Sequence, residues 1–153
     1  MSQSKQLQKV LNASIQSLSS VLPLKINVQA PAMIGNSYDQ KEISVIIGLV
    51  GDVKGRMILD TTLSKISDIG EAMFGMKIEG EMVESFCGEL GNMIAGNLCT
   101  LLEKDSLTVD ISPPTVMVGT AKISGFQKAI QLPLQFDDSS TMHLLLTIED
   151  SKV

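Results

Sequence analysis

Apolar side chains recur along the first twenty residues at intervals of three and four. These intervals place them on one face of an amphipathic helix, which Pro23 is predicted to end. From residue 24 to residue 30 apolar and polar residues alternate, and Pro31 follows. A period of two predicts a half-buried strand over 24–30. The apolar face of the predicted helix consists of Leu7, Val10, Leu11, Ile15 and Leu18.

Two β-rich runs follow, Ile43 to Val50 and Val53 to Leu59, and they are joined at Gly51 and Asp52. These two residue types suit the two-residue turn of a hairpin. The runs are therefore predicted to pair as antiparallel strands. The long apolar stretch of the first run also makes it a candidate for a sheet edge that needs a cover.

Helical spacing returns after residue 62 and predicts two more helices. The first ends near Gly75, and a break at Gly80 precedes a long helix over 81–104. The apolar positions of the shorter helix are Leu63, Ile66, Ile69 and Met73.

The last third of the chain reads as strands separated by proline, glycine and a polar turn. Pro133 falls inside one of them and has no N–H for a ladder, so that strand is predicted to be an edge strand or to be bulged. The predicted strands are Thr108 to Ile111, Thr115 to Gly119, Ala129 to Phe136 and Met142 to Ile148.

Both halves of the chain show the same order of helix, strand and hairpin, although the residue identities do not repeat. An internal duplication explains this order. The pattern predicts an α+β fold in which long helices cover one face of a largely antiparallel sheet. A length of 153 residues with 44% hydrophobic content suits a single domain over 1–153.

The composition excludes several classes of function. A net charge of −5, with 12 Lys+Arg in no basic cluster, argues against a nucleic-acid surface. The longest apolar run, Val45 to Val50, is far shorter than the roughly 18 residues that a membrane span needs, and the start of the chain lacks a signal-peptide pattern. We therefore expect a cytoplasmic protein without membrane insertion.

The chain contains two cysteines and one histidine. Cys87 and Cys99 lie twelve residues apart on the same predicted helix, about 18 Å along its axis, too far for a disulfide. His143 has no neighbouring Cys or His at a metal-binding spacing and is interpreted as a strand residue. No metal site and no cofactor of its own are predicted.

The long helix 81–104 carries the chemistry. Ser85, Glu89, Asn92 and Gly96 recur at helical spacing and fall within about 60° of one another around the helix axis. Their stripe lies opposite the apolar face, so it is exposed to solvent or to a partner. The apolar face consists of Val83, Phe86, Leu90, Ile94 and Leu101.

Small residues flank this stripe, and they allow two interpretations. A glycine inside a helix costs about 1 kcal/mol relative to alanine, so a helix that keeps several should use them for close approach. That approach is either internal, against the first helix or the sheet, or to a partner. Asn97 lies within the apolar face and is expected to make structural hydrogen bonds. The small residues are Gly88, Gly91, Ala95 and Cys99.

Glu89 and Asn92 alone allow a simpler interpretation, a solvated helix face, because Glu-x-x-Asn is a common spacing. A catalytic triad is disfavoured because Ser85 has only the distant His143 as a possible base. Di-iron chemistry is disfavoured because it needs Glu-x-x-His on paired helices, and the chain has one histidine.

The string Ser85-x3-Glu89-x2-Asn92-x3-Gly96, set in GELGNMIAGNL and followed by ISPPTVMVG at 111–119, resembles the CheC/CheX/FliY family of chemotaxis phosphatases. The resemblance spans nearly the whole chain and includes the segment GLVGDVKGRMIL at 48–59. CheC proteins are similar but carry two Glu/Asn motifs, whereas QLQKVLNASIQSL in the first helix contains no glutamate. One motif resembles the CheX branch and implies one catalytic site per chain in a CheC-like fold.

The resemblance implies a protein aspartyl-phosphate phosphatase that acts on CheY, the response regulator of the flagellar motor. The helix would be inserted at the phosphorylation site, where the receiver domain holds Mg²⁺ and a lysine. Asn92 would position the attacking water, and Glu89 would pair with that lysine. Ser85 and Gly96 match motif positions and are assigned to helix shape and close approach.

A second function stays open at this point. Rotor proteins of the FliM type resemble the same fold and bind phosphorylated CheY without hydrolysing it, so a non-catalytic binding module is the alternative. Intact Glu89 and Asn92 favour the enzyme. The resemblance further implies a homodimer whose sheets join.

Overall fold

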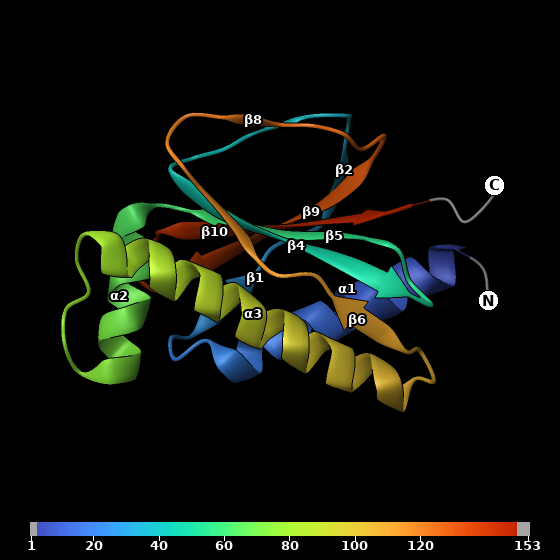
Figure 1. Cartoon of the computed structure of the whole chain (residues 1–153), viewed down its shortest axis with the longest axis horizontal. Helices are drawn as coiled ribbons and strands as arrows, with labels where there is room; N and C mark the ends of the chain where they lie inside the picture. Colours follow the sequence, from blue (N-terminus) through green and yellow to red (C-terminus); the bar gives the residue numbers. More distant parts are fainter. Residues whose placement is uncertain (1–2, 150–153) are drawn as a thin grey trace.

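A computed structural model describes residues 3–149, which form three helices and ten strands (Figure 1). The helices are α1 (Gln3–Val21), α2 (Leu63–Phe74) and α3 (Glu81–Lys104). The strands are β1 (Ile26–Val28), β2 (Ala32–Ile34), β3 (Tyr38–Asp39), β4 (Ile43–Gly51), β5 (Gly55–Thr61), β6 (Val109–Ile111), β7 (Thr115–Val118), β8 (Lys122–Ile123), β9 (Ala129–Phe136) and β10 (Thr141–Ile148).

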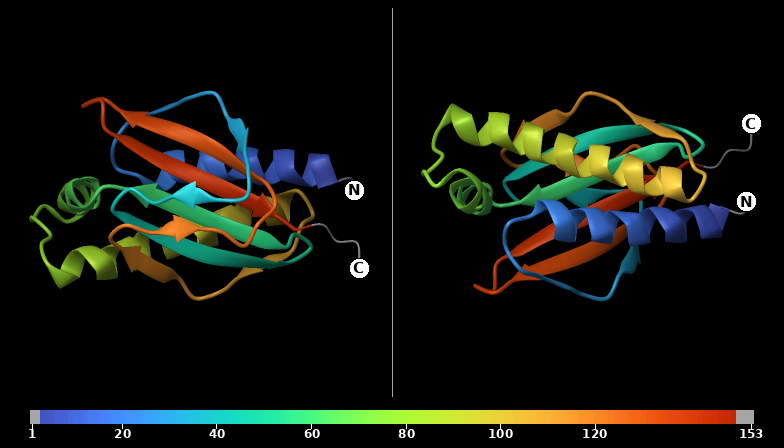
Figure 2. Two further views of the ribbon diagram at one scale, coloured as in Figure 1. Left: turned by 90° about the horizontal axis from the view of Figure 1, so that it is seen from above. Right: turned by 90° about the horizontal axis from the view of Figure 1, so that it is seen from below.

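Eight of these strands form one sheet in the order β1-β9-β10-β5-β4-β6, with β2 also on β9 and β7 also on β4. All of its pairings are antiparallel. Helices α1 and α3 lie side by side across one face of the sheet, and α2 lies near the N-terminal end of α3 (Figure 2). The α+β prediction, with helices on one face of an antiparallel sheet, is confirmed.

The two halves of the chain are interleaved. Strands β1 and β2, which follow α1, pair with β9 of the second half, and β6 and β7, which follow α3, pair with β4 of the first half. The hairpins β4–β5 and β9–β10 meet through β5 and β10 at the centre of the sheet. The strand order is thus the same when read from either half, and the two pseudo-repeated halves predicted from the sequence are confirmed.

The face of the sheet away from the helices is covered by the short ribbon β3–β8 (Figure 1). Tyr38 of β3 donates a hydrogen bond to Asp60 Oδ2 at 2.6 Å, and the Lys41 N–H donates to the same carboxylate. Burial raises the pKa of Asp60, while these hydrogen bonds oppose the rise. The ribbon encloses a small apolar cluster made of Tyr38, Ile58, Ile123 and Leu145.

The hairpin turn differs from its prediction. The last ladder pair of β4 and β5 is Leu49 with Gly55, so the connection is longer than two residues. Gly51, at a φ of +116°, pairs with Val109 of β6 instead, and Val53 is buried in the core. Because Val53 is buried and Gly51 pairs with β6, the connection is longer than the two-residue turn that was predicted.

Two further predictions about strands are wrong. Strand β4 is not an edge, because β5 pairs with one side of it and β6 and β7 pair with the other. The strand with Pro133 is neither an edge nor bulged, because β10 pairs with it in unbroken register and β1 and β2 pair with its other side. In addition, strands β2, β3 and β8 were not predicted, and β1 is shorter than predicted.

Pro133 lies where the register of β9 passes from β2 to β1. Its carbonyl accepts a hydrogen bond from the Gln29 N–H at 2.9 Å, so its nitrogen faces the same gap between the two outer strands. The corresponding gap on β4 lies at Gly48, between the pairings with β7 and β6. There the Ser112 hydroxyl accepts the Gly48 N–H at 2.7 Å. At the Gly48 junction the backbone N–H has an acceptor, and at the Pro133 junction no backbone N–H needs one.

Candidate functional site

Helix α3 lies close to the sheet because two of its glycines face β4 and β7. A Cβ added at Gly91 would lie 2.7 Å from Val45 Cγ1, and one at Gly88 would lie 3.3 Å from Val116 Cγ2. For these two glycines the internal interpretation is therefore correct: they permit close packing of the helix on the sheet.

Contacts with α1 fix the other flank of α3. Ser17 of α1 donates a hydrogen bond to the Ile94 carbonyl at 2.7 Å, and Asn97 Nδ2 donates to the Ser17 hydroxyl at 3.2 Å. The prediction that Asn97 is a structural hydrogen-bonder is confirmed. Held on both flanks, α3 can present only one stripe outward.

That stripe carries the predicted site residues. Ser85 and Glu89 are exposed, and Asn92 and Gly96 are half-buried. Within residues 3–149, the side chains of Ser85, Glu89 and Asn92 make no hydrogen bond or ion pair. Their polar groups are therefore free to act on another molecule.

Ser85, Glu89 and Asn92 line one open hollow between α3 and the segment before β7. The segment 111–119 is part of the pattern that carries the family resemblance, but no role was predicted for its residues. The pairing of β7 with β4 places that segment beside the helix. The remaining walls of the hollow are Glu84, Gly88, Pro114 and Val116.

Gly96 lies outside the hollow, one turn further along the same stripe. A Cβ added there would meet nothing within 4 Å. The packing of this chain therefore gives no reason for a glycine at this position, although a glycine in a helix costs about 1 kcal/mol relative to alanine. The second interpretation, close approach by a partner, stays open for Gly96.

The hollow offers a carboxylate and an amide. An ionised carboxylate accepts hydrogen bonds and pairs with cations, whereas an amide both donates and accepts but is no base. Among the described residues, no group of three or more His, Cys, Asp or Glu could hold a metal ion. This pair of groups can orient a water molecule and bind a cationic side chain.

The other reactive residue types do not take part in this hollow. His143 lies on β10, where its Nδ1 is 3.0 Å from Gln131 Nε2, and burial lowers its pKa. Burial raises the pKa of the Cys87 thiol to about 12 and also raises that of Cys99. Both cysteines are free, as predicted, and neither is an activated nucleophile.

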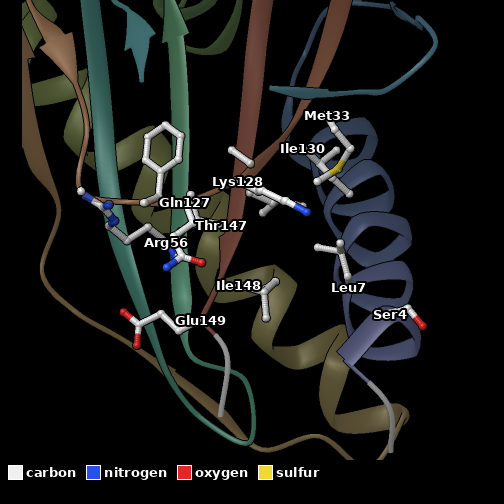
Figure 3. Close-up of a pocket in the computed structure, with 14 residues that line it drawn as sticks. Ser4, Leu7, Met33, Arg56, Gln127, Lys128, Ile130, Thr147, Ile148 and Glu149 are labelled. Atoms are coloured by element: carbon white, nitrogen blue, oxygen red, sulfur yellow. Dashed lines mark hydrogen bonds between the residues drawn. The ribbon is translucent and has the colours of Figure 1, made fainter. Parts of the chain in front are cut away.

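A larger pocket lies near the start of α1 and the end of β10, and none of the predicted site residues lines it (Figure 3). Of its two cationic residues, Arg56 and Lys128, Arg56 already has internal partners: it donates to the Ser124 carbonyl at 3.2 Å and lies 5.8 Å from the ring centroid of Phe126. We therefore place the candidate site at α3. No helix in the described part of the chain has the length and apolar character of a membrane span.

A family model and a known relative each match more than half of the chain. The family model described as chemotaxis phosphatase CheX matches residues 43–133, which include the whole of α3. The chain is 28% identical over 149 residues to the CheY-P phosphatase CheX of Thermotoga maritima, an alignment that covers 92% of this chain and 96% of the relative.

Two solved structures show the same fold. The chemotaxis protein CheX of Desulfovibrio desulfuricans superposes with a TM-score of 0.78 at 20% identity, over 93% of this chain and 97% of that one. The CheX–CheY–BeF3–Mg²⁺ complex of Borrelia burgdorferi gives a TM-score of 0.76 at 25% identity, over 94% and 97% of the two chains.

Proposed function

The chain belongs to the chemotaxis phosphatase CheX family, and on this premise we propose that it is a cytoplasmic phosphatase for the aspartyl phosphate of a CheY-type response regulator. One observation carries the proposal: Glu89 and Asn92 line one hollow on a helix that is fixed on both flanks, and neither side chain has an internal partner. The described residues form one eight-stranded sheet with helices on one face and the β3–β8 ribbon on the other, which supports a single domain.

The reaction is hydrolysis of an acyl phosphate. Water attacks the phosphorus in line, the bond from phosphorus to the aspartyl oxygen breaks, and the products are inorganic phosphate and the free carboxylate. Such a reaction depends on positioning and on neutralisation of charge. A receiver domain that holds Mg²⁺ and a lysine supplies the neutralisation, so the phosphatase has to supply the water-positioning group.

Asn92 is that group. Its Oδ1 accepts a hydrogen bond from the water and its Nδ2 donates one, which fixes the orientation of the water without removing its proton. The proton leaves with the phosphate product. Because Asn92 is half-buried beside β7, its side chain has fewer conformations than a fully exposed one.

Glu89 fixes the docking register. It lies about one turn before Asn92 and is exposed, so it can form a charge-assisted pair with the receiver lysine. Ser85 and Gly96 are small residues at the two ends of the stripe, and their small size leaves room for the receiver backbone.

The test is release of inorganic phosphate from a panel of phosphorylated CheY-type receivers. Asn92→Ala is expected to lower the rate at least about a hundredfold, equivalent to about 2.7 kcal/mol of barrier, because the oriented water is lost. The matched control is Asn12→Ala, which removes the exposed asparagine of α1 and should leave the rate unchanged. Receiver binding without hydrolysis by the wild-type protein would instead identify a FliM-like binding module.

We also propose a homodimer in which sheets join. The outermost strands are β1 and β2 at one edge and β6 and β7 at the other, and they carry the exposed apolar side chains Val28, Met33 and Val118. Edge strands with apolar side chains are suited to pairing. Sedimentation at micromolar concentration should give a dimer, and a monomer would contradict this part of the proposal.

A further inference from the structure

The stripe of α3 is bordered by two surfaces of different chemistry. One border is the hollow with Pro114 and Val116. On the other, Met82 and Met93 lie at about 60° and 80° around the helix axis, measured from Ser85, next to Glu89 at about 40°. These methionines are 54% and 41% exposed, respectively.

Phe74 extends this second border toward α2. It is the last residue of α2, it is 60% exposed, and its ring stands edge-on to Phe86 of α3 with 5.5 Å between centroids. Figure 1 shows α2 next to the start of α3, with the connecting segment running from the end of α2 to the first turn of α3. We call Phe74, Met82 and Met93 the apolar flank. Three large apolar side chains exposed on one side of a polar stripe indicate a surface that a partner covers.

We propose that the apolar flank is the part of the receiver-binding surface that supplies affinity, and that it packs on an apolar patch beside the phosphorylated aspartate of the receiver. This inference rests on the proposed function. A receiver that reaches Glu89 and Asn92 together must also cover Met93, because Met93 directly follows Asn92 and lies one turn beyond Glu89. The position of the flank therefore identifies its occupant.

The chemistry of the flank suits this role. Methionine is flexible and polarisable and adapts to the shape of a partner, and methionine and aromatic residues are enriched where proteins bind. None of the three side chains carries a group that could act on a phosphate or a water. Their contribution should therefore be equal in the ground state and the transition state, which changes KM and leaves kcat unchanged.

The experiment is steady-state phosphate release by Met82→Ser/Met93→Ser, with CheY phosphorylated by acetyl phosphate. We expect KM to rise about tenfold at unchanged kcat. Titration with CheY carrying BeF3 and Mg²⁺ should show the same tenfold loss of affinity. The control is Val50→Ser, which removes a 50% exposed apolar side chain from β4, outside the hollow and outside the outermost strands of the sheet. Met82→Leu/Met93→Leu should restore KM, because it keeps the apolar surface.

Each outcome separates this inference from the proposed function. If the wild-type protein releases no phosphate, the proposed function is wrong. If it does and the serine variant keeps its KM, or loses kcat alone, the apolar flank has no role in docking. A similar rise of KM in Val50→Ser would also overturn the inference. If the serine variant loses a dimer in sedimentation and keeps its affinity for CheY, the flank binds a second copy of this chain instead.

Discussion

The two halves of this chain share one topology and differ in what their helices carry. Helix α1 contains no acidic residue and no glycine, whereas α3 contains four glutamates and three glycines. Both helices lie on the same face of the sheet and are joined through Ser17 and Asn97. The duplicated fold therefore supplies the scaffold twice, whereas the proposed site uses a few positions of one helix.

After the loss expected for Asn92→Ala, the largest expected effect concerns Glu89. Glu89→Ala should lower kcat/KM about thirtyfold, equivalent to roughly 2 kcal/mol, because the receiver lysine would be left without its partner. Glu103→Ala, at the exposed end of the same helix, is the control of equal charge. Gln16→Ala tests whether an exposed amide of α1 contributes. Steady-state assays with phosphorylated CheY measure all three, and an effect of Gln16→Ala would break the comparison between the halves.

The next effect concerns the close packing of α3 on the sheet through its glycines, a residue type that α1 does not contain. Gly91→Ala should lower the free energy of unfolding by about 2 kcal/mol, because the new Cβ would lie 2.7 Å from Val45. Urea unfolding measures this change. Unchanged stability would show that the helix can move away from the sheet without loss.

A smaller effect is expected at the two junctions between outer strands. Ser112→Ala should lower the free energy of unfolding by about 1 kcal/mol, because the Gly48 N–H loses its acceptor. At the other junction Pro133 has no N–H, and the Gln29 side chain bonds only to the Asn27 carbonyl. Gln29→Ala should therefore be neutral in the same unfolding measurement. Equal losses in both variants would contradict this account of the junctions.

The smallest effect has the opposite sign. Gly96→Ala should raise the free energy of unfolding by up to about 1 kcal/mol, because alanine favours the helix and its Cβ meets nothing within 4 Å. Phosphate release should fall in the same variant if the glycine is kept for the approach of the receiver. A more stable variant with full activity would remove Gly96 from the site.

Much of the fold was predictable because most elements have a strong local period. Helix α3 and strand β9 have the predicted bounds, and α1 and α2 end where Pro23 and Gly75 require. The interleaving of the halves was not predictable, because it depends on pairings between distant strands. Pro133 shows the limit: its missing N–H predicts an edge strand or a bulge, yet it lies at a gap inside the sheet, in a strand without a bulge.

The candidate site was predictable to the same degree. Helical spacing alone placed Ser85, Glu89 and Asn92 on one exposed stripe, and the structure brings them to one hollow. Pro114 and Val116 were missed as walls, because their place beside the helix depends on the pairing of β7 with β4. The sequence likewise left open whether Gly91 packs inside the chain or against a partner, since only the structure shows Val45 against it.

The pairing of β1 with β9 has a consequence for synthesis of the protein. Ile26 pairs with Phe136, so the first strand to leave the ribosome has no partner until most of the chain has been made. Contacts of such long sequence separation slow folding, and they expose unpaired strands in the meantime. Strands β1 and β2 therefore stay unpaired during synthesis until the β9–β10 hairpin has been made.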